Sequence, residues 1–298
     1  MEIKSYLNNQ QRIVEDGLQA LMLQATGPFF KHLEAMRYSL FVGGKRVRPI
    51  LCLATGQAID NRPETANNLL PIACALECIH TYSLIHDDLP AMDNDALRRG
   101  KPTNHILFGE AGAILAGDSL LTFAFELLSR EKNNTLPAEK RLRIIEMVAR
   151  AAGPLGMAGG QALDIDSEKT AVPFPVLQTI HLAKTGALIT CSVQAGAIGA
   201  GASPEQMEKL TIYGEKIGLA FQIVDDILNV TSTTEQLGKA AGSDANRGKA
   251  TYPAYFGVEQ TKIMAKEAIE EAIDALLGFD VKADPLRQLA TYIYTRSN

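Results

Sequence analysis

Apolar residues recur at three- and four-residue spacing through most of this 298-residue chain, and alternating runs of β-branched residues are nearly absent. This periodicity is typical of amphipathic helices and leaves little room for a sheet. Hydrophobic residues make up 46% of the sequence, enough for a substantial core, and no low-complexity linker or fixed-period repeat divides it. We therefore predict one all-α domain over residues 1–298, a bundle of about ten helices. The predicted helices span residues 2–24, 28–42, 46–59, 63–88, 107–130, 137–158, 173–200, 204–230, 251–277 and 283–296.

Proline and capping residues support several of these helix starts. Pro63 and Pro137 each precede a glutamate near a predicted start, and Ser203 can cap a helix that has Pro204 in its first position. The segment 231–250 is rich in Thr, Ser, Gly and Lys and is the longest predicted loop.

Two acidic clusters lie far apart in the chain, each within an apolar, helix-forming stretch. They are Asp87-Asp88-Leu89-Pro90-Ala91-Met92-Asp93 and Asp225-Asp226-Ile227-Leu228-Asn229. Carboxylates in such surroundings are costly unless they pair or bind cations, and adjacent like charges raise that cost. Oxygen ligands favour Mg²⁺, which completes its coordination with water and phosphate oxygens. With basic residues spread elsewhere in the chain, the clusters predict Mg²⁺ ions held between facing carboxylates and a diphosphate ligand.

The first cluster cannot gather its carboxylates on a regular helix. Asp87 and Asp93 are six residues apart, which would separate them by about 240° around a helix axis. Pro90 disfavours a continuing helix, so we expect the helix to end at Asp87 and Asp88 and Asp93 to lie on the following turn. Carboxylates at a helix C-terminus oppose the helix dipole, and a bound cation would relieve that repulsion.

Charge and composition exclude several classes of protein. The net charge of −5 argues against a general nucleic-acid binder. The polar, amphipathic start of the chain lacks the features of a signal peptide, and we find no apolar run of the ~18 residues that a membrane span needs. Four cysteines lie in apolar helical patterns, which favours reduced core thiols in a cytoplasmic protein. Cys74 and Cys78 are one helical turn apart, but no His or further Cys completes a metal site with them.

Further motifs surround the acidic clusters in a fixed order along the chain. They are Gly43-Gly44-Lys45-Arg46-Val47-Arg48-Pro49, His80-Thr81-Tyr82-Ser83-Leu84-Ile85-His86, Leu97-Arg98-Arg99-Gly100-Lys101-Pro102-Thr103, Gly159-Gly160-Gln161, Lys184-Thr185-Gly186-Ala187-Leu188-Ile189, Phe221-Gln222-Ile223-Val224, Leu237-Gly238-Lys239 and Gly248-Lys249-Ala250-Thr251-Tyr252-Pro253. Over nearly its whole length, the chain resembles the short-chain trans-isoprenyl diphosphate synthases, most closely those of the bacterial farnesyl type. One such motif alone would be weak evidence for the resemblance, but all of them in this order are highly specific for the family.

The resemblance implies an all-α bundle whose two acidic motifs face across a deep central cavity. Three Mg²⁺ ions would join these motifs to an allylic diphosphate, which condenses head to tail with isopentenyl diphosphate. The implied metal-site residues are Asp87, Asp88, Asp93, Asp225 and Asp226. The residues implied to hold the allylic diphosphate or its metal shell are Arg98, Lys184, Thr185, Gln222, Lys239 and Lys249. Those implied to hold isopentenyl diphosphate are Lys45, Arg48, His80 and Arg99. The resemblance also implies a homodimer.

Single residues of these motifs also fit plain structural roles. Arg98 and Arg99 could form a solvated pair, His80 could be an ordinary buried histidine, and Lys184 could solvate a helix bend. The acidic clusters favour the binding roles, because guanidinium groups suit phosphate oxygens and an allylic C–O bond that breaks needs cations on its leaving group.

Product length is expected to depend on the residues just before Asp87. Tyr82 and Ser83 are the fifth and fourth residues before it, and the resemblance places the floor of the prenyl cavity there. A bulky ring at Tyr82, with the two-residue insertion Pro90-Ala91, indicates a C15 product. On a helix Ser83 lies roughly under Asp87, whereas Tyr82 is about 140° away and must reach in from the side. Tyr82 could also be a plain core aromatic.

Three other functions remain open at this point. A geranylgeranyl diphosphate synthase would differ in the cavity floor, and a terpene cyclase would not need the Lys45, Arg48 and His80 pocket. A non-catalytic regulatory subunit is hinted at only by Asn229, which stands where the family usually has an aspartate. Asp225 and Asn229 share a helix face with Asp226 turned away, which leaves Asp225 the nearer candidate ligand.

Overall fold

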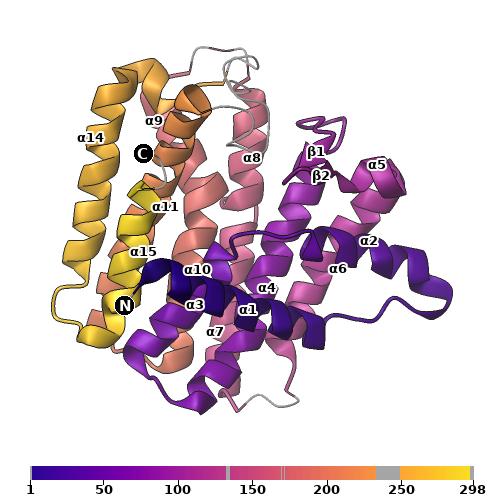
Figure 1. The fold of residues 1–298 in the computed structure, drawn as a ribbon, viewed down its shortest axis with the longest axis horizontal. Helices are drawn as coiled ribbons and strands as arrows, with labels where there is room; N and C mark the ends of the chain where they lie inside the picture. Colours follow the sequence, from indigo (N-terminus) through magenta and orange to yellow (C-terminus); the bar gives the residue numbers. More distant parts are fainter. Residues whose placement is uncertain (1, 132–134, 169, 171, 233–248, 296–298) are drawn as a thin grey trace.

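The computed structural model describes residues 2–131, 135–168, 170, 172–232 and 249–295. This part of the chain is almost entirely helical, which confirms the predicted all-α fold (Figure 1). The α-helices are α1 (Ile3–Leu21), α2 (Phe30–Phe41), α3 (Val47–Ile59), α4 (Pro63–Asp87), α5 (Asn104–Phe108), α6 (Glu110–Ser129), α7 (Ala138–Ala152), α8 (Met157–Asp166), α9 (Phe174–His181), α10 (Ala187–Ala200), α11 (Pro204–Thr231), α14 (Tyr252–Ala275) and α15 (Asp284–Thr295). The short elements are the 3₁₀ turns η1 (Gly27–Phe29) and η3 (Val281–Ala283), the π-helical turn η2 (Leu182–Gly186), and the antiparallel strands β1 (Leu97–Arg98) and β2 (Lys101–Pro102).

Several predicted helix starts have the expected chemistry. Pro63 and Pro204 occupy the first turns of α4 and α11, where a missing N–H costs nothing. Ser203 forms a full capping box with Gln206, because each side chain accepts a hydrogen bond from the other residue's backbone N–H, at 3.2 and 2.9 Å. α7 begins at Ala138, one residue later than predicted, so Pro137 is its N-cap and not its first helical residue.

Two helices predicted as continuous are interrupted. The predicted helix 137–158 ends at Ala152, and α8 starts after a turn over residues 153–156. The predicted helix 173–200 is divided by η2, whose π-helical turn carries Lys184 and Thr185. α5 and the β1–β2 hairpin were not predicted, because each is too short to show a hydrophobic repeat in the sequence. In α14, Gly257 has non-helical dihedral angles and marks a kink.

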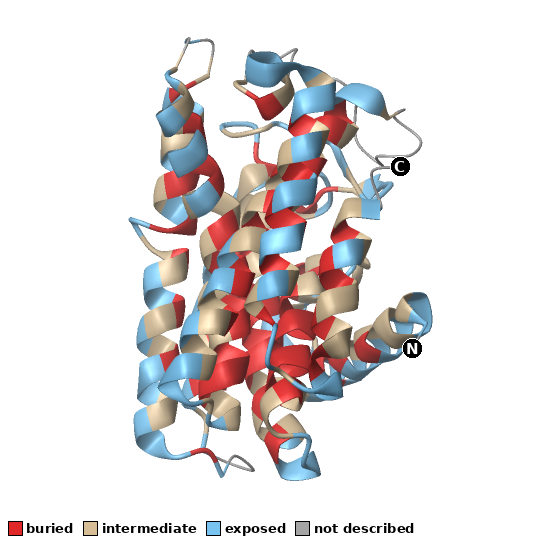
Figure 2. Cartoon of the chain, turned by 90° about the vertical axis from the view of Figure 1, so that its left-hand side faces the viewer, coloured by how far each residue is buried: buried red, intermediate tan, exposed pale blue. Residues whose placement is uncertain are grey.

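The core is built around two helices that are apolar on nearly every side. α4 packs against α1, α2, α3, α6 and α10, and α10 packs in turn against α3, α7 and α11. Figure 2 shows buried residues concentrated along the inner faces of the helices and exposed residues on their outer faces. A helix that is hydrophobic all round is stable only inside such a bundle. The C-terminal end of α4, which carries the first acidic cluster, is thereby fixed by packing along most of the helix.

Two helices are by length and composition apolar enough to span a membrane, whereas the sequence pattern predicts no such segment. They are α4 and α6, and 67% and 44% of their most apolar 18-residue windows are buried within the chain. A core helix of a globular protein passes the same test, as α4 does here. The assignment of the whole chain to one domain stays a prediction.

Candidate active site

One cavity of about 550 Å³ is lined by residues of both acidic clusters. It lies between the end of α4, the helices α8 and α11, the turn η2, and the residues just before α14. The site residues predicted from the sequence that line it are Arg48, His80, Tyr82, Ser83, Asp87, Asp93, Arg98, Lys184, Thr185, Gln222, Asp225, Asp226 and Lys249. Lys45, Asp88 and Arg99 do not line it, and Lys239 lies outside the described residues.

The first acidic cluster folds back on itself, as predicted from Pro90. α4 ends at Asp87, Asp88 is its C-cap, and the backbone N–H of Asp93 donates to the carbonyl oxygen of Asp87 at 2.8 Å. This turn brings into one cavity two carboxylates that a regular helix would separate. Burial raises the pKa of Asp87 to about 6, with Lys184 opposing the shift and Asp93 adding to it.

Asp88 is turned away from the cavity to hold an arginine. Its carboxylate accepts a bidentate pair of hydrogen bonds from Arg98, Nε to Oδ2 at 2.8 Å and Nη2 to Oδ1 at 2.5 Å. Asp88 is only 3% exposed, whereas Arg98 reaches the cavity. Two parallel bonds fix a guanidinium plane better than a single one does. In this arrangement Asp88 orients Arg98.

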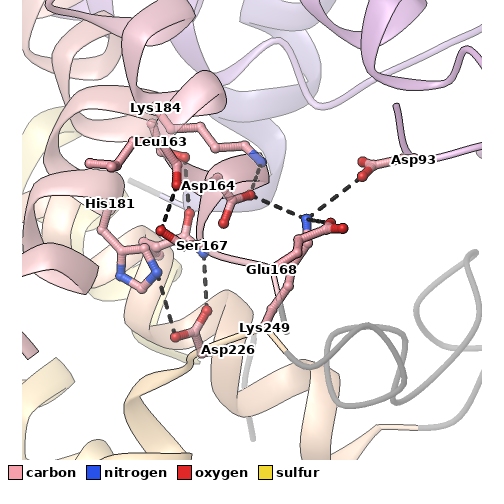
Figure 3. Close-up of polar contacts among 11 residues, drawn as sticks. Asp93, Leu163, Asp164, Ser167, Glu168, His181, Lys184, Asp226 and Lys249 are labelled. Atoms are coloured by element: carbon pink, nitrogen blue, oxygen red, sulfur yellow. Dashed lines mark hydrogen bonds and ion pairs between the residues drawn. The ribbon is translucent and has the colours of Figure 1, made fainter. Parts of the chain in front are cut away.

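The second acidic cluster presents two aspartates in different ways. Asp225 and Asp226 both line the cavity, but Asp226 is buried and accepts hydrogen bonds from the backbone N–H of Tyr252 at 2.9 Å and from Gln222 at 3.0 Å. His181 Nε2 lies 3.8 Å from Asp226 (Figure 3). The His181 ring also stacks on that of Tyr252. Asp226 therefore fastens α11 to the start of α14. Asn229, also buried, lies one turn further along α11.

A network of lysines and carboxylates lies beside the aspartates (Figure 3). Lys184 Nζ donates to Asp164 Oδ2 at 2.7 Å, and Lys249 Nζ donates to the same oxygen at 3.2 Å. Lys249 also lies 3.6 Å from Asp93 and 3.8 Å from Glu168. Burial would raise the pKa of Asp164, but the two lysines outweigh it and lower the pKa below its ordinary value. The two ammonium groups are thus gathered next to the first acidic cluster.

Glycines bring the backbone of η2 close to its neighbours. A Cβ atom on Gly160 of α8 would lie 2.3 Å from the backbone nitrogen of Lys184, so only glycine allows this approach. A Cβ atom on Gly218 of α11 would lie 3.0 Å from the Cα of Gly186. Through these contacts, Thr185 comes within 2.9 Å of Gln222 on α11, to whose side-chain oxygen its hydroxyl donates.

Basic residues form a second group beyond the end of the cavity that Arg48 and His80 line. Arg99 packs on the backbone of Gly44, where a Cβ atom would lie 2.6 Å from its guanidinium, so the β1–β2 hairpin contacts the loop that carries Lys45. Burial lowers the pKa of His80 well below its ordinary value, and the nearby Arg48 and Arg99 lower it further. A neutral His80 in a field of arginines is an environment that favours an anion.

The residues proposed to limit product length line the same cavity as the aspartates. Tyr82 is 9% exposed, and its ring meets the His86 ring edge to face at a centroid distance of 5.7 Å. Ser83 donates its hydroxyl hydrogen bond to the carbonyl of His80 at 2.9 Å. Apolar side chains on the other walls include Met157 and Ala158 of α8 and Phe221 of α11. The cavity wall therefore carries apolar side chains as well as charged ones.

The donor set fits Mg²⁺ ions that bind together with a phosphate ligand. Among the described residues, no three His, Cys, Asp or Glu side chains gather closely enough to hold a metal by themselves. Mg²⁺ usually takes one or two carboxylates and completes its shell with water and substrate phosphates. Asp87, Asp93 and Asp225 offer such carboxylates to one cavity, and a cation would offset the desolvation that raises the pKa of Asp87.

Two acidic residues of this network were not predicted. Asp164 and Glu168 belong to the segment 159–172, for which the apolar pattern predicts no helix and therefore no helix face. A signal was present, because Asp164 is three residues after Gln161 and one turn after Gly160, both within a quoted motif.

The comparisons with known proteins cover nearly the full chain. A family described as "Polyprenyl synthetase" matches residues 31–279. The chain is 48% identical over 295 residues to a geranylgeranyl diphosphate synthase of Cyanophora paradoxa, covering 99% of this chain and 96% of that protein. It is 46% identical over 298 residues to a farnesyl diphosphate synthase of Geobacillus stearothermophilus, covering 100% and 99%. A crystal structure of a FPP/GFPP synthase from Zymomonas mobilis superposes with a TM-score of 0.86 at 39% identity, covering 98% of each chain. The chain belongs to the polyprenyl synthetase family.

Proposed function

We propose that the protein is a Mg²⁺-dependent farnesyl diphosphate synthase, a short-chain prenyltransferase. It would condense isopentenyl diphosphate with dimethylallyl or geranyl diphosphate and release pyrophosphate. The observation that carries this proposal is the single cavity in which Asp87, Asp93 and Asp225 lie beside Lys184 and Lys249. Carboxylates alone would suit many metals, but carboxylates with two ammonium groups suit a metal-bound diphosphate.

The proposed reaction breaks the bond between the allylic carbon and its diphosphate oxygen. A new carbon–carbon bond then forms with the terminal double bond of isopentenyl diphosphate, and one proton leaves to the released pyrophosphate. Mg²⁺ held by Asp87, Asp93 and Asp225 would supply positive charge to the leaving group when bound. Lys184 and Lys249 would bind and orient the same diphosphate, so its growing negative charge meets donors already in place.

The second diphosphate would bind to the basic group at the other end. Arg48 and His80 line the cavity, and Arg99 and Lys45 lie on the adjoining loops. This placement would hold the double bond of isopentenyl diphosphate near the allylic carbon, which favours attack over capture by water.

The C15 product is supported by Tyr82, whose ring forms part of the cavity wall next to Ser83 and His86. A second candidate, geranylgeranyl diphosphate synthase, is favoured by the 48% identity to the Cyanophora paradoxa protein of that name. The two differ only in how long a prenyl chain the apolar end accepts. Product length is therefore the property to measure.

The test is incubation of the purified protein with isopentenyl diphosphate, an allylic diphosphate and Mg²⁺, followed by mass spectrometry. A C15 diphosphate that disappears with EDTA supports the proposal, and a C20 product supports the second candidate. A cyclic hydrocarbon from farnesyl diphosphate would indicate a cyclase. A folded protein that makes no product would favour a regulatory subunit and overturn the proposed activity.

We also expect a homodimer and a cytoplasmic location. The homodimer is supported by α6, which is strongly apolar yet less than half buried, with Ile114 and Leu115 43% and 56% exposed. Light scattering on the purified protein would test it: a monomeric mass at micromolar concentration would contradict this expectation.

A further inference from the structure

A buried ion pair lies directly beneath the basic group that we assign to isopentenyl diphosphate. Arg46 Nη1 donates to Glu77 Oε1 at 2.7 Å, and the side chains of both residues are 1% exposed. Arg46 stands between Lys45 and Val47 in the motif, but its side chain points into the protein and does not line the cavity. Its role therefore differs from that of the neighbouring Lys45 and Arg48.

Arg46 joins the loop to three helices. Its Nη2 donates to the carbonyl of Leu40 in the last turn of α2 at 2.7 Å, and Glu77 lies in the middle of α4. From α1, the Glu15 carboxylate lies 3.7 Å from Arg46 Nε. Gln11, also on α1, donates to the carbonyl of Gly44 at 2.9 Å. One guanidinium and its neighbours thus set where the loop lies relative to α1, α2 and α4.

The backbone at Arg46 requires this anchoring. Arg46 has a positive φ of 50°, a left-handed conformation that is strained for a residue other than glycine. Its carbonyl accepts the first hydrogen bond of α3, from Ile50 at 3.0 Å. The strained residue is therefore the point at which the loop becomes helix, and Arg48 follows two residues later.

On α4, the anchor lies one turn from a predicted ligand. Glu77 and His80 are three residues apart, which places them on adjacent turns of the same helix face. Glu77 also supplies the negative charge beneath the arginines. Burial lowers the pKa of Arg48 to about 10, and Glu77 opposes that shift, as it opposes the lowering of the pKa of Arg99.

A buried ion pair is a weak source of stability, since well-packed apolar residues often replace one at no cost. Glu77 Oε2 is buried and has no hydrogen-bond partner in the described part of the chain, so this pair is not optimised for stability. The pair instead serves to hold the loop, because the Arg46 guanidinium binds Glu77 with one nitrogen and the carbonyl of Leu40 with another.

On the basis of the proposed function, we infer that Arg46 and Glu77 are positioning residues for isopentenyl diphosphate. They do not touch the substrate. They fix the loop that carries Lys45 and the first turn of α3, which carries Arg48, next to His80 on α4, and thereby keep the basic pocket assembled before the substrate arrives.

The experiment compares Arg46→Met, Arg46→Lys and Glu77→Gln with the wild type. Isopentenyl diphosphate alone does not react, so calorimetry measures its binding independently of turnover. We expect its Kd and KM to rise by about tenfold or more in Arg46→Met and Glu77→Gln, because a shift of about 1 Å in binding groups is this costly. KM for the allylic diphosphate should stay within about twofold of the wild-type value, and Arg46→Lys should recover part of the loss, since it keeps the charge without the fork.

Arg287→Met is the matched control. Arg287 ties the loop between α14 and α15 through the carbonyls of Leu276 and Phe279, each at 2.8 Å, and it does not line the cavity. Its loss should lower the melting temperature and leave KM for isopentenyl diphosphate unchanged. Should Arg46→Met fold poorly, the double variant Arg46→Met with Glu77→Leu removes both charges and replaces them by apolar side chains.

Three outcomes decide the inference. Folded Arg46→Met, or the folded double variant, with wild-type affinity for isopentenyl diphosphate overturns it. An equal rise in KM for both substrates also overturns it, because that would show general loosening of the site. A wild-type protein that binds isopentenyl diphosphate but makes no prenyl product overturns the proposed function alone, and the binding comparison remains valid.

Discussion

Lys184 Nζ lies 2.7 Å from Asp164 Oδ2, a carboxylate oxygen of helix α8 that is shared with Lys249. The carboxylate gathers two ammonium groups that would otherwise repel each other. Because both lysines line the cavity beside Asp87 and Asp93, Asp164 sets their spacing for a diphosphate. Its negative charge holds the two lysines together on the cavity wall that all three residues line.

Replacing Asp164 by asparagine should weaken the allylic site. Asp164→Asn keeps the shape but loses two charge-assisted hydrogen bonds, each worth about 1.5–3 kcal/mol, so we expect kcat/KM to fall by about tenfold to a hundredfold. Steady-state kinetics with varied allylic diphosphate measure this. Asp166→Asn, at an exposed position two residues along the same helix, is the control. Equal kinetics in both variants would show that Asp164 has no such role.

The close approach of α8 to η2 predicts a strong effect at Gly160. In Gly160→Ala, the added Cβ would lie 2.3 Å from the Lys184 backbone nitrogen. Because a backbone atom cannot rotate away as a side chain can, either α8 or η2 must shift. Such overpacking costs about 1–3 kcal/mol, and we expect activity to fall together with the melting temperature. Gly112→Ala is a milder control, because its Cβ would meet only the Cβ of Phe108, at 3.2 Å. A fully active Gly160→Ala enzyme would argue against a fixed position of Lys184.

Tyr82 should limit the length of the product. Tyr82→Ala removes a ring from the cavity wall, and we expect products longer than C15, identified by mass spectrometry after dephosphorylation. The same change should cost about 3–5 kcal/mol of stability, so the assay is best run well below the melting temperature. Tyr82→Phe keeps the ring and should keep the wild-type product. An unchanged product from Tyr82→Ala would assign Tyr82 to the core alone.

His181 should make the protein less stable in mild acid. Burial lowers its pKa from 6.5 to about 4, so the folded state takes up this proton less readily than the unfolded state. Its contribution is fully present above about pH 6.5 and is lost as the pH falls toward 4, by up to about 3 kcal/mol. Urea unfolding at several pH values should give a shallower pH slope for His181→Gln than for the wild type. His32→Gln, which loses a histidine on α2, is the control, and a slope for His181→Gln equal to that of the wild type would exclude this role.

The sequence predicted most of the helices because their apolar repeats are long. It also predicted the end of α4 at Asp87, since Pro90 restricts the residue before it, and the structure confirms this turn. The interruption at η2 could not be predicted, because a single π-helical turn does not change the apolar repeat. The break after Ala152 had a signal in Gly153 and Pro154, which the apolar pattern on either side obscured.

For the site, the sequence identified residue types better than their partners. Asp88 and Asp226 stay predicted metal-site residues, and the structure adds partners that the sequence did not reveal: Arg98 for Asp88 and the backbone of Tyr252 for Asp226. These partners come from a hairpin and from the start of a distant helix. Local spacing determines which helix face a side chain occupies, and tertiary packing determines what it meets there.

The backbone contact at Gly160 also separates two properties of the cavity. The positions of the charged groups follow from main-chain approach and capping turns, whereas other parts of the cavity wall are formed by side chains such as Tyr82 and Met157. Substitutions there can change how large a tail fits without disturbing the reactive end. The same arrangement of charged groups can therefore serve products of different size, so that the length of the prenyl chain can change while the chemistry stays the same.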